Sequence, residues 1–318
     1  MDNIIKCIEE AKSVVIISHI DEDTDAFGSS LAMLEMLRNM GKKAVYYLSK
    51  PIEKRIGFLS DDYKVFDKDK ISGRIDLLIC LDSGDIGRLG ERARLLDMAD
   101  KTINIDHHYT NTLYAMENRV NGDMSSTCEM VYDLFCEMNV NITNKMARYL
   151  YSGIMADTGC LKYNCASPKT AMTISKLMEY DIDHAELCRK IFDIEPISTI
   201  RLKGYVMNNL ESYYNGKVTL AALNEETLSK FGVGENETGD IVNIPKSVMG
   251  TEIAVFIKKT KEKIKISLRS NGKYNVGEIA VKLGGGGHEM AAGAPMPLCD
   301  INEAKKRVIE IIGESLAD

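Results

Sequence analysis

The stretch SVVIISHIDEDTDAFGSS, residues 13–30, decides how the first half of this chain folds. Its first six residues are a largely apolar run of strand length, which leads directly into His19, Asp23 and Asp25. Leucines at helical spacing then predict a helix from about residue 26 to residue 40. A strand, a polar turn and a helix in this order are the repeating unit of an α/β fold.

The same unit recurs along the first half of the chain. Strands are predicted at residues 13–18, 43–48, 77–81 and 102–105, and helices at residues 26–40, 126–139, 144–156 and 169–180. Continuous apolar strands separated by helices predict a parallel sheet that is covered on both faces. In open sheets of this kind, ligands bind outside the carboxyl ends of the strands.

Polar side chains follow three of these strands where each one ends. The first strand leads into His19, Asp82 follows the strand LLICL, and the sequence Asp106-His107-His108 follows the strand TINI. Because the carboxyl ends of parallel strands meet at one edge of the sheet, we expect these side chains to form one shared site.

The chemistry of the candidate ligands indicates a pair of divalent cations. The candidates are His19, Asp23, Asp25, Asp82, His107 and Asp157. Oxygen and imidazole ligands without a thiolate suit Mn²⁺ or Mg²⁺ better than a structural zinc ion. Two such ions about 3.5–4 Å apart lower the pKa of a bridging water from near 16 towards about 7, as phosphoester hydrolysis requires. The competing interpretation is a solvated acidic loop in which Asp25 caps the helix. For Asp21 and Glu22 it is the interpretation we prefer.

The second half of the chain changes character. Residues 185–209 are helical and charged, with a break at Glu195-Pro196, and predict a connector. Beyond it, the predicted elements are strands at residues 217–223, 252–259 and 263–269, and helices at residues 276–283 and 301–316. These elements predict a second, smaller α/β domain.

A glycine-rich loop is predicted between the last two helices. It consists of Gly284, Gly285, Gly286 and Gly287. Consecutive glycines let backbone N–H groups approach an anion closely, and the adjacent His288 and nearby Arg269 could contact phosphate. The segment is not GxxxxGK[ST], so it is not a P-loop. We expect a ligand-binding loop, and a flexible hinge is the alternative.

Bulk composition narrows the class of protein. The 318 residues are 45% hydrophobic and 27% charged, with a net charge of −7. This balance argues against a large basic surface for long duplex DNA, but it leaves room for a small phosphorylated substrate. Eight cysteines without a CxxC pair are typical of buried thiols in a reducing compartment. No apolar run reaches membrane-spanning length, so we expect a cytoplasmic location.

Six short motifs, taken in their order along the chain, indicate a protein family. They are HxxxDxDAxGS (19–29), LDSGDIGRLG (81–90), IDHH (105–108), ADTG (156–159), SLRS (267–270) and GGGGHEMAAG (284–293). Together they resemble the DHH phosphoesterase family with its DHH-associated domain, and in particular its short oligoribonucleases that also act as pAp phosphatases. The resemblance covers nearly the whole chain.

The resemblance implies a domain layout with the active site in the cleft between two α/β domains. It makes residues 1–184 a parallel-sheet, metal-binding catalytic domain. Residues 185–209 become a helical connector, and residues 210–318 a smaller substrate-binding domain.

The resemblance also implies roles for individual residues. His19 and Asp23 would hold one Mn²⁺, and Asp25, His107 and Asp157 the other, with Asp82 bridging both. Asp106 would orient the site, and His108 would contact the scissile phosphate or assist the leaving group. Arg269, His288 and the loop Gly284–Gly287 would hold the other phosphate of the nucleotide. Arg88 is a weaker candidate, for which a surface salt bridge is an equal alternative.

Two departures from the family pattern concern substrate choice. Thr24 replaces a flexible glycine, and Cys160 and Leu161 stand where many relatives carry a basic residue and an aromatic one. We expect a metal-dependent hydrolase of short oligonucleotides, linear dinucleotides and pAp. A cyclic-dinucleotide phosphodiesterase and a non-catalytic nucleotide sensor are the alternatives. A pyrophosphatase and a RecJ-like exonuclease are less favoured, and the sequence leaves a homodimer open.

Overall fold

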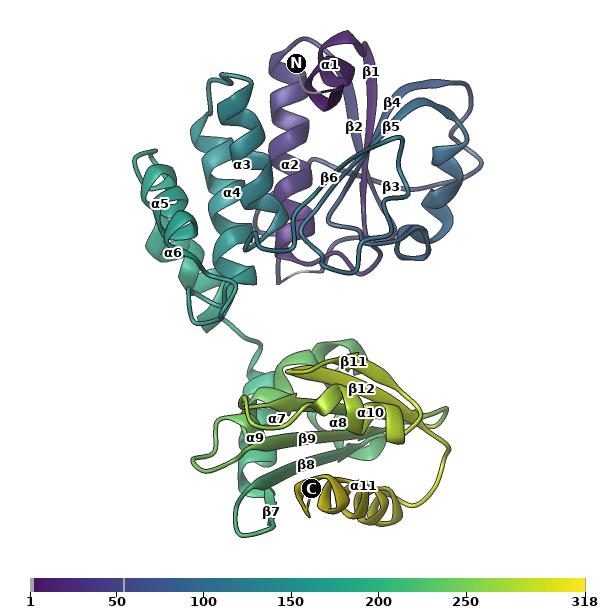
Figure 1. The fold of residues 1–318 in the computed structure, drawn as a ribbon, viewed down its shortest axis with the longest axis vertical. Helices are drawn as coiled ribbons and strands as arrows, with labels where there is room; N and C mark the ends of the chain where they lie inside the picture. Colours follow the sequence, from purple (N-terminus) through teal and green to yellow (C-terminus); the bar gives the residue numbers. More distant parts are fainter. Residues whose placement is uncertain (1–2, 54, 318) are drawn as a thin grey trace. The chain divides into compact units, whose positions relative to one another are not determined.

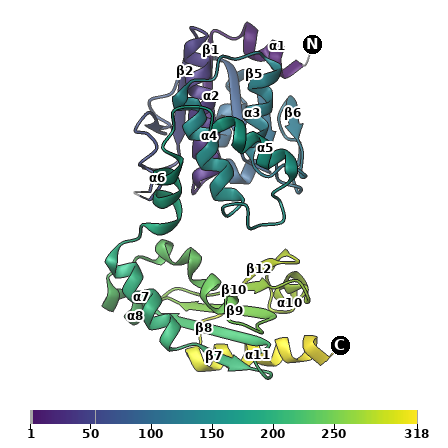
Figure 2. The same ribbon diagram turned by 90° about the vertical axis from the view of Figure 1, so that its left-hand side faces the viewer.

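A computed structural model describes residues 3–53 and 55–317 of the chain. Residues 1, 2, 54 and 318, which fall within the two predicted domains, lie outside the described residues. The chain divides into two compact units, Met1–Ile194 and Glu195–Asp318, which are described separately below (Figures 1 and 2). The division falls inside the predicted connector.

The N-terminal unit is built on a six-stranded parallel sheet with the strand order β3-β2-β1-β4-β5-β6. The strands are β1 (Ser13–Ser18), β2 (Lys43–Leu48), β3 (Lys64–Val65), β4 (Ile75–Leu81), β5 (Ala99–Asp106) and β6 (Glu117–Val120). The prediction of a parallel sheet is therefore confirmed. The edge strands β3 and β6 were not predicted, because their short sequences KV and ENRV carry no apolar run.

Helical segments cover both faces of this sheet, as Figure 1 shows. Those in contact with the strands are α1 (Asn3–Glu10), α2 (Thr24–Asn39), the 3₁₀ segment η1 (Ile86–Leu96) and α3 (Thr127–Glu137). Helix α4 (Asn144–Asp157) packs mainly against α2 and α3, and α5 (Pro168–Leu177), α6 (His184–Cys188) and the π-helical turn η2 (Arg189–Asp193) pack against α4. Val14 and Ile16 of β1 pack among the helices on one face, whereas Val15 and Ile17 pack against η1 on the other. Burial on both faces explains why these strands are apolar at every position.

The C-terminal unit contains a second six-stranded sheet with the order β11-β12-β10-β9-β8-β7. Its strands are β7 (Glu211–Tyr213), β8 (Val218–Asn224), β9 (Ile253–Lys259), β10 (Ile264–Ser270), β11 (Gly286–His288) and β12 (Ala291–Met296). Only β8 and β9 run parallel among these pairs. The helical segments are α7 (Ile197–Asn208), α8 (Glu225–Phe231), η3 (Glu235–Val242), α9 (Asn243–Lys246), α10 (Val276–Lys282) and α11 (Ile301–Ala317). The α/β class predicted for this half is confirmed.

The glycine run differs from the predicted loop, because its second half pairs with β12 as the edge strand β11. A Cβ at Gly285 would lie 2.2 Å from the carbonyl oxygen of Gly293, and one at Gly287 would lie 2.5 Å from Cα of Ala292. These two glycines are therefore required for close packing of the backbone. Gly284, with φ +83, supplies the turn after α10, and Gly286 is exposed.

Among the described residues, no helix combines the length and the apolar character needed to cross a membrane.

Candidate metal centre

The candidate centre lies at the carboxyl ends of β1, β4 and β5. His19 follows β1, Asp82 follows β4 and His107 follows β5. The chain leaves β1 towards β2 on one side of the sheet and returns at β4 on the other side, so β1 and β4 flank the point where the strand order reverses. Such a reversal leaves a crevice above the strand ends, which is where open α/β sheets bind ligands.

The structure brings all six predicted ligands together in overlapping groups. Three groups of side chains each have their ligand atoms within 4.8 Å of one another: His19–Asp23–Asp82, Asp25–His107–Asp157 and Asp82–His107–His108. The first group has the members that the family pattern implied for one cation, and the second has those implied for the other except Asp82, which is grouped with His107 in the third. That these residues bind metal stays a prediction, but the donor set of carboxylate oxygens and imidazole nitrogens fits divalent cations.

Asp82 occupies the middle of the centre. Its side chain is 2% exposed, with Oδ2 3.4 Å from Nε2 of His19 and Oδ1 3.5 Å from Nε2 of His107. The hydroxyl of Thr127 donates a hydrogen bond to Oδ1 at 2.9 Å and so fixes the carboxylate. Its backbone has φ +56, a left-handed conformation that Asp and Asn tolerate better than most residues. The two oxygens of Asp82 thus face different ligand groups.

The ring orientations of the three histidines are set through Nδ1. His19 Nδ1 lies 2.6 Å from the carbonyl oxygen of Ile20, and His107 Nδ1 lies 3.4 Å from that of Met124. Since a carbonyl oxygen only accepts, these contacts assign the proton to Nδ1 and leave Nε2 of the neutral ring free to bind a metal. His108 Nδ1 instead donates to Oδ1 of Asp106 at 2.7 Å.

Asp25 is anchored by the start of α3. Its two carboxylate oxygens accept hydrogen bonds from the backbone N–H groups of Thr127 at 2.7 Å and Cys128 at 2.9 Å. The backbone of α4 also approaches closely, because a Cβ at Gly153 would lie 2.9 Å from Asp25 Oδ1. Helix α2 begins at Thr24, so Asp25 lies in its first turn and is buried.

The structure also differs from the competing interpretation, in which Asp25 caps the helix. The N-cap of α2 is Asp23, whose Oδ1 accepts from the N–H groups of Asp25 and Ala26. Asp23 and Asp25 point towards different ligand groups because helix α2 begins between them, at Thr24. Asp23 faces His19, and Asp25 faces His107.

The electrostatics of the centre indicate that a positive charge belongs there. Burial, followed by repulsion from Asp82 and Asp23, raises the pKa of Asp157 from 3.8 to about 8. Burial, followed by the charges of Asp82 and Asp157, raises the pKa of Asp25 well above its usual range. Burial lowers the pKa of His19, but its contacts with Asp23 and Asp82 outweigh burial and raise it to about 10. Crowded carboxylates that hold protons so tightly are the surroundings in which a bound cation is favoured.

We expect the metal-free protein to become less stable as the pH rises from about 6 to about 8. The raised pKa values of Asp157 and His19 mean that the folded state holds protons which the unfolded chain releases at lower pH. The stability they contribute is therefore lost as the pH rises towards their folded-state values. Bound cations need deprotonated ligands, so the rise in Tm on adding Mn²⁺ should be larger at about pH 8 than at about pH 6. Thermal melts with and without Mn²⁺ measure this, and an equal rise at both pH values would contradict it.

Asp106 and His108 belong to a hydrogen-bonded network that includes Asn111. Asp106 is fully buried, and its Oδ2 accepts from Nδ2 of Asn111 at 2.6 Å. The same Nδ2 lies 2.8 Å from Oδ1 of Asn104. The hydrogen bond with Asp106, acting against burial, raises the pKa of His108 to about 9. Asn111 was not predicted as a member of the site. The one indication in the sequence is that it lies three residues after His108.

The acidic loop before α2 is only partly the solvated turn that was predicted. Asp21 is exposed and pairs with Lys50. Glu22 is buried and forms an ion pair with Arg92, so its assignment as a solvated residue was wrong. Arg88, a weak substrate-binding candidate, is exposed on η1, and its carbonyl oxygen accepts from the N–H of Ile20 at 2.7 Å.

In the C-terminal unit, strand register places Arg269 and His288 on the same face of the sheet. Arg269 of β10 and His288 of β11 both pair with Ala291 of β12, and directly paired residues project to one face. Two strand spacings separate them, which is about 10 Å. The small side chain of Ala291 lies between Arg269 and His288. Whether they contact substrate stays a prediction.

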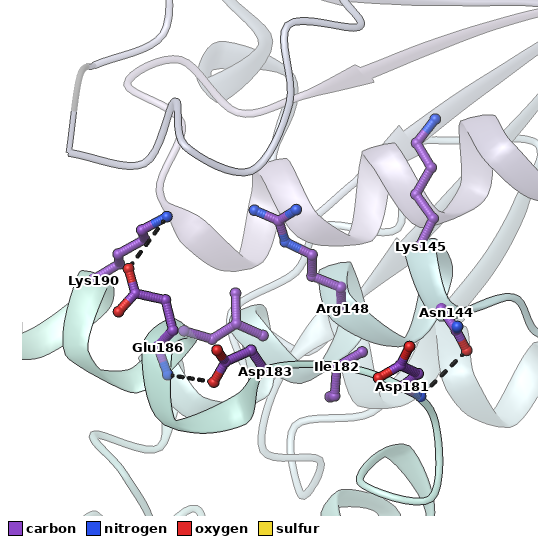
Figure 3. Close-up of a pocket in the computed structure, with 9 residues that line it drawn as sticks. Asn144, Lys145, Arg148, Asp181, Ile182, Asp183, Glu186 and Lys190 are labelled. Carbon is purple, nitrogen blue, oxygen red and sulfur yellow. Dashed lines mark hydrogen bonds and ion pairs between the residues drawn. The ribbon is translucent and has the colours of Figure 1, made fainter.

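A pocket of about 400 Å³ lies elsewhere on the N-terminal unit, between α4 and α6 (Figure 3). Arg148 and Lys190 line it together with Glu186, which forms an ion pair with Lys190. None of the predicted site residues lines this pocket. Cationic and anionic side chains line it in equal numbers, which indicates no preferred ligand charge.

Comparison with known proteins identifies the family. A family model described as the DHH family, N-terminal domain, matches residues 13–154, and one described as the DHHA1 domain matches residues 215–314. The chain is 31% identical to the bifunctional oligoribonuclease and PAP phosphatase NrnA of Thermus thermophilus, over 98% of this chain and 92% of that protein. The chain belongs to the DHH family. The resemblance drawn from the six motifs is thereby confirmed.

Further similar proteins and structures extend the comparison. The protein of the same name from Bacillus subtilis is 26% identical, over 92% of this chain and 91% of that protein. An exopolyphosphatase-related protein from Bacteroides fragilis matches this DHH chain with a TM-score of 0.90 and 29% identity, over 99% of this chain and 94% of that one. RecJ of Thermus thermophilus in complex with Mn²⁺ matches with a TM-score of 0.55 at 14% identity, which reflects the fold alone.

Proposed function

We propose that this DHH protein is a divalent-metal-dependent phosphoesterase that hydrolyses short oligoribonucleotides and pAp. The observation that carries the proposal is the convergence of the groups His19–Asp23–Asp82 and Asp25–His107–Asp157, with Asp82 in contact with His19 of the first and His107 of the second. Relatives named oligoribonuclease and PAP phosphatase match along nearly the whole chain, which supports this substrate class.

The proposed cofactor is a pair of Mn²⁺ ions, with Mg²⁺ as the alternative. His19, Asp23 and Asp82 would hold one ion, and Asp25, His107, Asp157 and Asp82 the other. When bound, the ions would activate water and neutralise charge on the phosphate oxygens. Carboxylate and imidazole ligands suit Mn²⁺, which accepts both oxygen and nitrogen donors.

His108 is the proposed general acid. Its hydrogen bond with Asp106 raises its pKa to about 9 and holds the Nδ1–H, which favours the protonated form of the ring. The proton on Nε2 is therefore available for the leaving oxygen of the ester. The side chain is 42% exposed, so a substrate can reach it. Asp106 and Asn111 would act by positioning this ring.

The proposed role of the C-terminal unit is to bind the part of the nucleotide that is not cleaved. Arg269 and His288 share one face of its sheet, and their backbone positions are about 10 Å apart. Their side chains could therefore both contact one phosphate bound between them. The exposed backbone at Gly286 lies beside them on β11. Recognition of a second phosphate would favour short substrates with a terminal phosphate, such as pAp.

The substrate class is tested with purified protein, Mn²⁺, a labelled diribonucleotide and pAp. We expect mononucleotide products from the first and inorganic phosphate from the second, with no turnover after chelation of the metal. Failure to hydrolyse either compound by a protein that binds Mn²⁺ would contradict the proposal.

A cyclic dinucleotide serves as a third substrate in the same assay. The cyclic-di-AMP phosphodiesterase PdeA of Listeria monocytogenes is 25% identical over 96% of this chain, but the chain covers only 48% of that protein. We therefore expect hydrolysis of the linear dinucleotide to be faster than that of the cyclic one. The opposite order would favour the cyclic-dinucleotide alternative.

A further inference from the structure

The loop between β1 and α2 carries two of the proposed metal ligands, His19 and Asp23. Between them lies Glu22, whose side chain turns away from the ligands and into the protein, where it is 1% exposed. A buried carboxylate costs desolvation energy unless it is paired and hydrogen-bonded. The hydrogen-bond partners of Glu22 therefore indicate which parts of the protein its buried side chain holds together.

Glu22 is bonded from two neighbouring segments. Its Oε1 accepts from Nη1 of Arg92 at 2.8 Å, and the Arg92 side chain is also 1% exposed. The same oxygen accepts from the backbone N–H of Ser49 at 3.0 Å, just after β2, and the Ser49 hydroxyl donates to both carboxylate oxygens at 3.2 Å. One side chain thus joins the ligand loop to the end of β2 and to η1.

Arg92 is itself fixed by backbone carbonyls. Its Nη1 donates to the carbonyl oxygen of Tyr47 at 2.9 Å, and its Nε to that of Leu89 at 3.3 Å. A second link between η1 and the loop lies nearby. The side chain of Ile20 packs so closely on Gly90, which has φ +59, that a Cβ there would lie 2.8 Å from Ile20 Cγ2. The loop is therefore held to η1 on both sides of Asp21.

We propose that Glu22 and Arg92 are a positioning pair that fixes the ligand loop before a cation binds. The inference rests on the proposed metal centre, since it concerns the affinity of the His19–Asp23–Asp82 group. With the loop held, His19 and Asp23 need not be ordered at the moment of binding, so less conformational entropy is lost. The charge of Arg92 also neutralises Glu22, so the pair adds no net charge to the crowded centre. Changes in groups that orient metal ligands typically cost about 10–100-fold in metal affinity.

The test compares two acid-to-amide changes at adjacent positions, Glu22→Gln and Asp21→Asn. Asp21 is on the same loop but exposed, and Asn tolerates its φ of +58. Calorimetric titration of the metal-free proteins with Mn²⁺ alone measures affinity without activity. We expect Glu22→Gln to weaken Mn²⁺ binding by about 10-fold or more. Asp21→Asn should change it by less than about twofold, because exposed ion pairs contribute little.

A second variant separates positioning from stability. Glu22→Gln leaves the Arg92 charge buried without its partner, so loss of fold is one outcome. The double variant Glu22→Leu/Arg92→Leu removes both charges and keeps apolar volume, and we expect its metal-free Tm to be close to that of the natural protein. Its Mn²⁺ affinity should remain about 10-fold or more weaker, because the links to Ser49 and Tyr47 are gone. At saturating Mn²⁺, the kcat of this double variant should return to that of the natural protein.

The outcomes distinguish the two proposals. If the natural protein binds Mn²⁺ and the folded Leu/Leu variant binds it equally well, the positioning role is wrong and the proposed function stands. If the natural protein binds no Mn²⁺, the metal centre is wrong, and this inference falls with it.

Discussion

The change Asp82→Asn should lower kcat by at least about 10³-fold while leaving the fold intact. The two oxygens of Asp82 face His19 and His107, so both ligand groups would lose a charged donor at once. Loss of several kcal/mol of transition-state stabilisation corresponds to an effect of this size. Asn is preferred to Ala here because the backbone φ is +56, which Asn tolerates.

The matched control is Asp123→Asn, an exposed acid in the loop before α3. The kcat of this Asp123→Asn variant should stay within about twofold of that of the natural protein, because the carboxylate of Asp123 lies outside the ligand groups. Steady-state kinetics at saturating Mn²⁺ and a thermal melt of each protein make the comparison. Retention of a tenth or more of the activity by Asp82→Asn would show that Asp82 does not serve both groups.

The change His108→Gln should lower kcat by about 10²–10⁴-fold, which is the usual contribution of a general acid. The effect should depend on the leaving group. A dinucleotide leaves as a poor alkoxide that needs the proton, whereas a nitrophenyl ester of a nucleotide leaves as a stable phenolate. We therefore expect His108→Gln to cleave the nitrophenyl ester at a rate within about 10-fold of the natural protein.

Mn²⁺ affinity serves as the internal control for this variant. His108 belongs to neither group assigned to a cation, so titration with Mn²⁺ should give a dissociation constant within a few-fold of the natural one. An equal loss of rate with both leaving groups would argue against proton donation. A large loss of Mn²⁺ affinity would instead place His108 among the ligands.

The convergence of the candidate ligands could be predicted from the sequence because of the topology that the sequence encodes. Apolar strands separated by helices predict parallel pairing, and parallel pairing brings the carboxyl ends of β1, β4 and β5 to one edge. His19, Asp82 and His107 each follow one of those ends, so their convergence needed no knowledge of distances. The roles assigned to them within the family pattern still await the experiments above.

The supporting residues could not be predicted, because their contacts are long-range. Glu22 is 70 residues from Arg92, and Thr127 is 45 residues from Asp82. An acidic run before a helix has the same appearance whether one member is buried or all are solvated. The glycine run was similarly ambiguous, because its pairing with β12 depends on small residues at Ala292 and Gly293.

The anchoring of Asp25 on α3 has a consequence for the folding kinetics of the N-terminal unit. Asp25 and Thr127 are 102 residues apart, so their hydrogen bond forms only after a long loop has closed. Contacts of such high sequence separation tend to form late, after most of the sheet is in place. Interactions that are absent from the folding transition state slow unfolding rather than speed folding. A cation bound beside Asp25 would therefore lengthen the lifetime of the folded unit and leave its rate of formation nearly unchanged.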